Sequence, residues 1–314
     1  MCAVIPLSLV LLAFANPSQL SPPPYNEGVG VLGDSYSDEY RFYPPDRPTA
    51  QNWVEILATR GLLNFGEYTT DKRPEPRNQG FAFNWARSDA TTEDAIKGGQ
   101  LDGLVAQVKR GKVKLAIVFI GGNDFINAMK SDDPMNAIEK ALPRATANFR
   151  KIVRSLLEAS PDLKLVLATI PDIRNLPEFA VPLREGRLSS EIADAYTVAI
   201  RKYNFLITTQ GLTEPRIAVA NLAVGTSLAN QWSTEAFPVA GKMIDRIHPG
   251  NTPEHFFLAD QRHTGTYGQA LIAQMLVDTI DVKFHLGIKP LAPDEIRRLV
   301  QPSLSDTLAR GVFP

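Results

Sequence analysis

Short apolar, β-prone runs alternate along the chain with longer segments whose apolar residues recur at helical spacing. The predicted strands are residues 29–32, 80–85, 114–120, 163–170 and 216–224. The predicted helices are residues 52–62, 101–108, 134–159, 190–208 and 265–286. Most of the strand runs are continuously apolar, which is typical of strands buried on both faces. The alternation therefore predicts an α/β fold, with a mainly parallel five-stranded sheet covered by helices on both faces.

The remaining segments carry no clear periodicity. Residues 177–187 are predicted to form an irregular insertion, and residues 225–257 an irregular stretch before the last helix. Residues 16–27, which are rich in proline and serine, are predicted to lead onto the first strand as an extended segment. We find no internal repeat and no clear domain boundary, so residues 28–314 are interpreted as one domain.

Residues 1–15 differ from the rest of the chain. The apolar run from Ala3 to Ala15 is too short to span a bilayer comfortably, and it ends in the small-x-small pattern of a signal-peptidase site. We expect residues 1–15 to be a signal peptide that is cleaved near Ala15, which predicts a secreted or periplasmic protein. The start carries no Lys or Arg, so a buried N-terminal strand or helix is the alternative. The sole cysteine, Cys2, lies in this segment, so cleavage would leave a chain without thiol or disulfide chemistry.

The composition is ordinary for a soluble globular protein, with 44% hydrophobic and 21% charged residues in a chain of 314. That length is enough to bury a large core without disulfide bonds. The formal net charge of −1 gives no reason to expect nucleic acid or an anionic membrane as a partner. The oligomeric state stays open.

Three of the predicted strands lead into small polar turns. These turns are Gly33-Asp34-Ser35, Ser88-Asp89-Ala90 and the segment 121–124 (Gly-Gly-Asn-Asp). In a parallel sheet all three lie at the carboxyl edge, where ligands bind. A serine hydroxyl there is a candidate nucleophile, and an asparagine amide there is a candidate donor to an oxyanion. The alternative for the first and third turns is a helix N-cap, because Asp, Ser and Asn are favoured caps.

A serine nucleophile needs a histidine base that an acid orients. The chain has four histidines, and two of them follow an aspartate by three residues: Asp245 with His248, and Asp260 with His263. At this spacing in a loop, the carboxylate can accept from Nδ1–H and leave Nε2 free to take the serine proton. His263 precedes the closing helix, which favours it over His248. His255 and His285 lack this spacing.

Four blocks in order resemble the GDSL, or SGNH, hydrolase family. The blocks are residues 33–37, 84–92, 121–124 and 260–263, and they span nearly the whole predicted mature chain. The resemblance implies a flavodoxin-like three-layer α/β/α sandwich and a serine esterase mechanism that needs no metal or cofactor. In that mechanism Ser35 is the nucleophile, His263 the general base and then acid, and Asp260 the orienting carboxylate.

The same resemblance implies an oxyanion hole made by the backbone N–H groups of Ser35 and Asp89 and the side-chain amide of Asn123. One departure concerns this hole, since Asp89 stands where the family has glycine. Its carboxylate would oppose an oxyanion unless it turns away or pairs with a cation such as Arg87. Two further departures look tolerable: Tyr36 stands where leucine is frequent, and Thr264 where proline is frequent. The residues expected to contact the substrate are Tyr36, Gly122 and Asp172.

We therefore expect a secreted serine esterase that cleaves short-chain acyl esters or carbohydrate acetyl esters. The alternative is a non-catalytic or weakly active carbohydrate-binding protein, favoured by Asp89 and by the aromatic residues Tyr40, Phe42 and Tyr43. Metal-dependent hydrolysis is disfavoured, because acids such as Asp132-Asp133 lack a His/Asp ligand set at metal spacing. The expected partner is a small-molecule or carbohydrate ester, with no nucleic acid and no stable membrane span.

Overall fold

A parallel sheet forms the centre of the computed structural model, which describes residues 25–42, 50–70, 80–232, 235–239 and 242–300. Within these ranges four strands pair in the order β1-β4-β5-β6. They are β1 (Val29–Gly33), β4 (Leu115–Phe119), β5 (Lys164–Ala168) and β6 (Ile217–Ala220). Every residue of β1 and β4 is buried, which explains their uninterrupted apolar sequence. The predicted signal peptide and most of the predicted leader lie outside the described residues.

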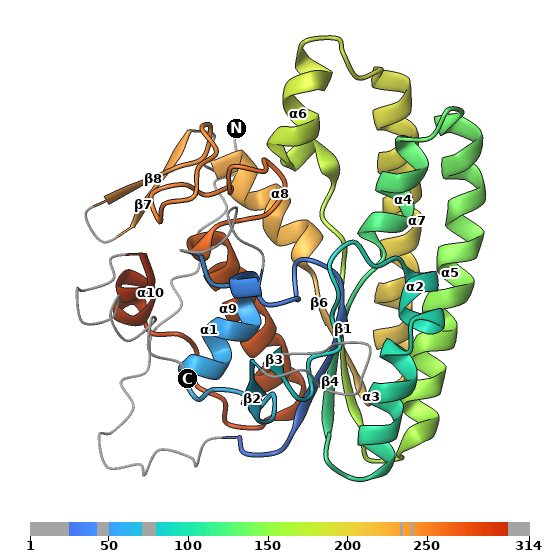
Figure 1. Cartoon of the computed structure of the whole chain (residues 1–314), viewed down its shortest axis with the longest axis vertical. Coiled ribbons are helices and arrows are strands. Elements are labelled where there is room, and N and C mark those ends of the chain that lie inside the picture. The colour runs from blue at the N-terminus through green and yellow to red at the C-terminus, as the bar shows by residue number, and fades with distance from the viewer. Residues whose placement is uncertain (1–24, 43–49, 71–79, 233–234, 240–241, 301–314) are drawn as a thin grey trace, which may run out of the picture.

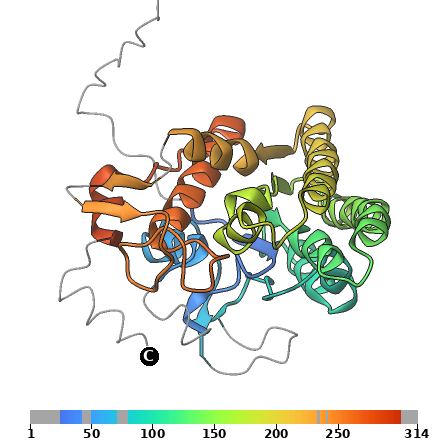
Figure 2. The same cartoon turned by 90° about the horizontal axis from the view of Figure 1, so that it is seen from above.

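Helices cover both faces of the sheet, which confirms the three-layer α/β/α arrangement (Figures 1 and 2). One face carries α1 (Trp53–Thr59), α8 (Leu222–Trp232), α9 (Thr266–Phe284) and α10 (Pro293–Val300). The other carries α2 (Thr92–Lys97), α3 (Gln100–Lys109), α4 (Gly122–Met129), α5 (Pro134–Ala159) and α7 (Ser190–Thr213). The long predicted helix at residues 134–159 is confirmed by α5, which begins at Pro134, a residue preorganised for a first helical turn.

The predicted count of five sheet strands is wrong by one in the described part of the chain. The expected strand at residues 80–85 contributes only an isolated parallel bridge, between Asn84 and Val31 of β1. The chain turns there, with the Asn84 N–H donating to the Phe81 carbonyl at 3.0 Å. Beyond the turn, Val31 of β1 donates to Phe83 O and accepts from the Trp85 N–H, both at 2.9 Å, but these bonds make only the single bridge and no strand. Just before the turn, β3 (Gly80–Phe81) pairs instead with β2 (Tyr68–Thr69), in antiparallel register.

Three other predictions are corrected. Residues 177–187 are mainly helical, forming α6 (Pro177–Arg184) after the 3₁₀ turn η2 (Ile173–Asn175). The last strand ends at Ala220 and not at Val224, because α8 begins two residues later. The stretch 225–257 contains the rest of α8 and a hairpin of β7 (Ala236–Val239) and β8 (Lys242–Asp245). Another 3₁₀ turn, η1 (Tyr40–Phe42), follows the first polar turn.

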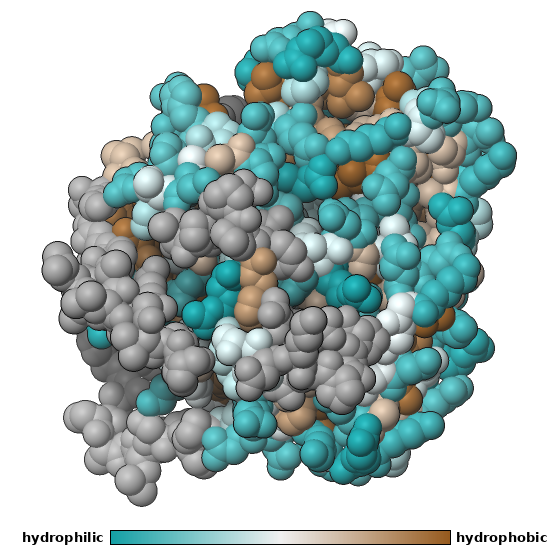
Figure 3. All heavy atoms as spheres, in the orientation of Figure 1, coloured by the Kyte–Doolittle hydropathy of each residue, from teal (hydrophilic) through white to brown (hydrophobic). Residues whose placement is uncertain are grey.

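The surface is mostly hydrophilic on the face seen in Figure 3, with apolar side chains scattered among charged and polar ones. None of the helices in the described ranges combines the length and apolarity that crossing a membrane requires. The carboxyl ends of β1 and β4 lie side by side, since Gly33 is in register with Phe119. The turns that follow these two strands therefore meet at one edge of the sheet.

Candidate active site

A chain of hydrogen bonds joins a serine, a histidine and an aspartate at this edge. Ser35 lies directly after β1, and its Oγ is 2.7 Å from Nε2 of His263. The other ring nitrogen, Nδ1, lies 2.6 Å from Oδ2 of Asp260. Ser35 and His263 are only 4% and 5% exposed, so bulk water does not compete for the bond between them.

Asp260 is held by the loop that carries the histidine. Its second oxygen, Oδ1, accepts the backbone N–H groups of Arg262 and His263 at 3.0 and 2.9 Å. Burial raises the pKa of Asp260, but the His263 ring and these backbone donors outweigh it and lower the pKa to about 2. The carboxylate is therefore ionised at neutral pH. It fixes the proton on Nδ1 and leaves the Nε2 lone pair facing the serine.

Two tyrosines from the segment after Ser35 support the histidine loop. The Tyr36 hydroxyl donates to Arg262 O at 2.7 Å, and the Tyr40 hydroxyl donates to Thr264 O at 3.1 Å. The Tyr36 ring lies 5.3 Å from the His263 ring, and the Tyr40 ring meets it edge-on at 6.2 Å. Tyr36, which stands where the family often has leucine, thus contributes a hydroxyl that bonds to the histidine loop. Tyr40 is fully buried and cannot stack on a sugar, and Tyr43 lies outside the described residues.

The groups expected to form an oxyanion hole lie at neighbouring turns. In the described part of the chain, the backbone N–H groups of Ser35 and Asp89 have no hydrogen-bond partner. The Asn123 side chain donates one amide hydrogen to Ala90 O at 3.1 Å, which ties it to the turn containing Asp89 and leaves its second hydrogen available. The capping alternative is wrong for Asn123, because Gly121 is the N-cap of α4 and Asn123 is the second residue of the helix.

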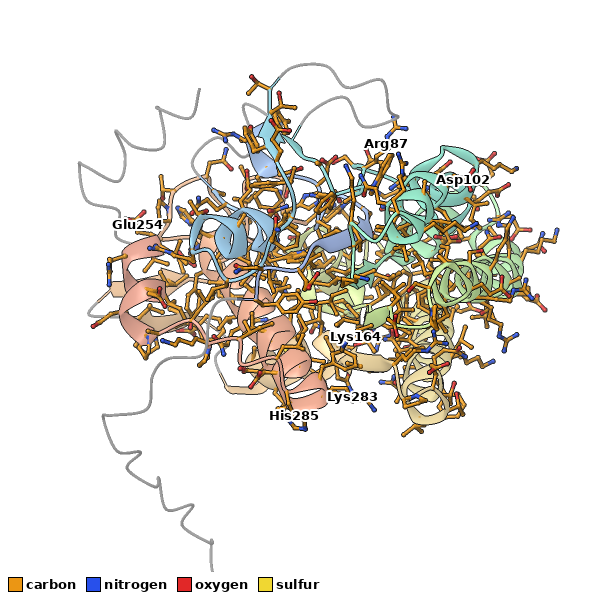
Figure 4. All side chains as sticks on the ribbon, turned by 90° about the horizontal axis from the view of Figure 1, so that it is seen from below. Arg87, Asp102, Lys164, Glu254, Lys283 and His285 are labelled. Carbon is orange, nitrogen blue, oxygen red and sulfur yellow. The ribbon has the colours of Figure 1, made fainter. Side chains whose placement is uncertain are left out.

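The backbone conformation of Asp89 explains why the family has glycine at this position. Its φ is +63°, a left-handed value that glycine adopts freely and aspartate tolerates better than most residues. The residue is exposed. A nearby cation is Arg262, whose pKa is raised chiefly by its hydrogen bonds to Glu178 and to a lesser degree by the Asp89 carboxylate. The expected partner, Arg87, points outward at the surface (Figure 4) and acts on Asp94.

A cavity of about 40 Å³ opens beside Ser35. Its wall is mainly apolar, and Tyr36 and Gly122 belong to it, as does Asn123; Asp89 does not. Asp172 is not part of this wall either, and its carboxylate caps η2 by accepting the Arg174 N–H at 2.9 Å. The wall residues are Asp34, Ser35, Tyr36, Phe119, Gly122, Asn123, Ile126, Ile170, Pro171, Leu176, Tyr196 and Arg262.

The second Asp-x-x-His motif has nearly the same local geometry but a different environment. His248 Nδ1 lies 2.8 Å from Asp245 Oδ2, and Oδ1 accepts the backbone N–H groups of Ile247 and His248 at 2.8 and 3.0 Å. The His248 side chain is 76% exposed, whereas that of His263 is 6% exposed. His285 ends α9 at the periphery (Figure 4), and His255 Nδ1 bonds to His248 O. Only His263 among these reaches the serine.

No group of three or more His, Cys, Asp or Glu side chains in the described ranges is arranged to hold a metal ion. Asp133, one of the acids considered above, caps α5 by accepting the Asn136 N–H.

A buried serine that faces a histidine and a carboxylate, beside unoccupied backbone donors, is the arrangement that hydrolases use for acyl transfer. The model of the family described as GDSL-like lipase/acylhydrolase matches residues 29–276. The chain therefore belongs to this family, as the four sequence blocks predicted, and is a hydrolase that acts on ester bonds.

Solved structures that resemble this chain include three esterases or lipases of low sequence identity. A lipase from a goat rumen metagenome is 14% identical, with a TM-score of 0.49, over 81% of this chain and 97% of that one. A Clostridium thermocellum family 3 carbohydrate esterase is 12% identical, with a TM-score of 0.43, over 83% and 98%. A catalytic mutant of a Geobacillus stearothermophilus acetylxylan esterase is 15% identical, with a TM-score of 0.43, over 82% and 95%. A comparison with curated proteins found no match.

The acid before the serine titrates at an unusual pH. Burial raises the pKa of Asp34 to about 7; the Tyr36 N–H, which donates to it at 3.1 Å, lowers the pKa, and the charges of Asp124 and Asp89 raise it. In the unfolded chain an aspartate has a pKa of about 4. The folded state thus binds this proton more tightly, so Asp34 costs stability as the pH rises from about 4 to about 7.

We predict that Asp34→Asn, which keeps an acceptor for the Tyr36 N–H, removes this cost. The free energy of unfolding of the variant relative to wild type should rise by up to about 4 kcal/mol between pH 4 and pH 7, and stay level above. Urea unfolding at several pH values measures it. Asp102→Asn, at an exposed position of α3 (Figure 4), is the control. A difference that does not change with pH would contradict the assignment.

Proposed function

We propose that this chain hydrolyses esters through an acyl-enzyme on Ser35. The observation that carries the proposal is the 2.7 Å approach of Ser35 Oγ to His263 Nε2, with Asp260 2.6 Å from the far side of the ring. As Oγ attacks the ester carbonyl, Nε2 takes the hydroxyl proton, and the charge on the imidazolium is offset by the Asp260 carboxylate. The low pKa of Asp260 keeps that charge available at neutral pH.

The tetrahedral oxyanion is proposed to accept the backbone N–H groups of Ser35 and Asp89 and the free amide hydrogen of Asn123. When it collapses, the bond from the acyl carbon to the alcohol oxygen breaks, and His263 returns its proton to that oxygen. A water molecule then attacks the acyl-Ser35 carbonyl, with His263 again as base. The acid leaves, and the serine recovers its proton.

The size of the cavity beside Ser35 supports a short acyl group. Its volume of about 40 Å³ has room for roughly three water molecules, since a cavity needs about 10–15 Å³ to hold one. The surrounding side chains, among them Phe119, Ile126 and Ile170, suit a methyl or short alkyl end. We therefore place acetyl and similarly short acyl esters, including carbohydrate acetates, as the substrate class.

We predict that Ser35→Ala and His263→Ala each lower kcat on an aryl acetate by about 10³-fold or more, the scale measured for members of such triads. His248→Ala is the matched control, because its hydrogen bond to an aspartate is equivalent but exposed, and it should keep most of the activity. A fluorophosphonate probe should label wild type on Ser35. Absence of labelling, or undiminished turnover by Ser35→Ala, would favour the binding-protein alternative.

The proposed oxyanion role of Asn123 predicts a separate effect. Asn123→Ala should lower kcat by about 10²- to 10³-fold, the scale measured for loss of one such donor. The KM should change little, because the donor acts mainly on the charge that develops in the transition state. Steady-state kinetics on the aryl acetate measure both quantities. Loss confined to KM would instead make Asn123 a substrate-binding residue.

We also propose that residues 1–15 direct export and are removed near Ala15. Expression of the full chain in a secreting bacterial host should yield an extracellular or periplasmic protein that begins at Asn16. Mass spectrometry of the N-terminus tests this, and an intact Met1 on exported protein would contradict it.

A further inference from the structure

A second cavity lies next to the catalytic one and is much larger. It encloses about 270 Å³, close to the lower end of the roughly 300–1,000 Å³ that is usual for small-molecule sites. It lies between α8, α9 and the segment that precedes the catalytic loop. Most of its wall is hydrocarbon, contributed chiefly by Leu222, Phe256, Leu271, Ile272 and Met275.

The two cavities share part of their walls. Tyr36, Pro171 and Leu176 line both, so these side chains lie between them. The residues on either side of His263 divide between the cavities: Thr264, which follows it, lines the large one, and Arg262, which precedes it, lines the small one. Gly122 and Asn123 line only the small cavity. The small cavity therefore lies on the side of Ser35 where the oxyanion donor Asn123 is, and the large one lies beyond Tyr36, next to Thr264.

Acyl transfer gives these two sides different occupants. The carbonyl oxygen turns toward the oxyanion donors, whereas the alcohol oxygen must lie beside the histidine that protonates it. We propose, building on the function proposed above, that the large cavity binds the hydrocarbon part of the leaving alcohol. The substrates are then esters of a short acid with a long or bulky apolar alcohol, cleaved to the free acid and that alcohol.

Two polar residues in the wall of the large cavity, Thr226 and Gln274, are already hydrogen-bonded within the protein. Thr226 Oγ1 donates to Leu222 O at 2.8 Å. Gln274 accepts the Leu291 N–H at 2.7 Å and donates to Asp278. Arg246 places its guanidinium over the Phe256 ring, 5.9 Å from the centroid. No carboxylate lines the cavity. The mainly apolar wall favours a hydrocarbon alcohol over a sugar, which narrows the class of esters proposed above.

The sharpest test compares two isomeric esters. Hexyl acetate and ethyl hexanoate contain the same atoms but carry the chain on opposite sides of the ester. Burying one methylene is expected to raise kcat/KM by up to about fourfold. Hexyl acetate should therefore be cleaved with a kcat/KM at least about 30-fold higher than that of ethyl hexanoate. Equal rates, or preference for ethyl hexanoate, would overturn the proposal.

A matched pair of variants on α8 tests whether the preference for hexyl acetate comes from the large cavity. Ala229 lines the large cavity, whereas its neighbour Leu228 is 45% exposed and does not. Ala229→Phe should lower kcat/KM for hexyl acetate at least tenfold and leave methyl acetate within about twofold, whereas Leu228→Phe should change neither. An equal loss on both esters with Ala229→Phe would overturn the proposal. Since the isomer comparison uses wild type, it does not depend on how either variant folds.

The experiments distinguish failure of the proposed acyl-enzyme mechanism from failure of the cavity assignment. If Ser35→Ala cleaves methyl acetate as fast as wild type does, the acyl-enzyme mechanism is wrong. If Ser35→Ala is inactive and wild type shows no preference for hexyl acetate, only the assignment of the large cavity is wrong. Octan-1-ol should bind to Ser35→Ala in calorimetry and lose at least tenfold in affinity when Ala229→Phe is added. Absence of binding to Ser35→Ala would overturn the assignment without involving turnover.

Discussion

The bond between Ser35 and His263 constrains the whole structure, because it joins residues 228 positions apart in the chain. The first strand must end where the loop before α9 returns to the sheet edge. A buried amide network holds these segments together. Gln269 of α9 donates to the Tyr40 hydroxyl at 2.6 Å and to Thr264 at 3.1 Å, and it accepts the Trp53 N–H that begins α1. Buried networks of this kind favour a single arrangement, because an unpaired group costs more than the bond contributes.

The electrostatics of this edge come from acids that gather around one serine. Asp34 and Asp124 are buried carboxyls whose pKa values are raised chiefly by that burial. Arg262 provides the opposing charge in the loop that carries His263, and its guanidinium donates to both oxygens of Glu178 in α6. The Glu178 N–H also donates to Gln261 O at 3.0 Å. Helix α6 thereby positions the loop of His263 as well as the cation that acts on Asp89.

Sequence reasoning brought together Ser35, Asp260 and His263 because strand ends and a three-residue spacing are local signals. The parallel sheet followed from buried apolar runs in the same way. The fifth strand failed because residues 80–85 have a strand-like composition but turn after Phe81, and Asn84 bonds to loop backbone. The effect of the Asp89 charge on Arg262 could not be predicted, since Glu178, which holds the Arg262 guanidinium, is 84 residues away from it in sequence. The large cavity depends on how α8 packs against α9, which no single segment encodes.

The two Asp-x-x-His turns show that this four-residue motif forms the same hydrogen bonds at two places in the fold. Each aspartate accepts two backbone N–H groups through one oxygen and meets its own histidine through the other. The four-residue unit therefore forms the hydrogen bonds of its acid–base pair locally, and the rest of the fold serves to place the buried copy against the serine. Transplanted beneath an exposed serine in another scaffold, it would bring its geometry with it. The receiving protein would still have to supply the shelter from water that only the buried copy has here.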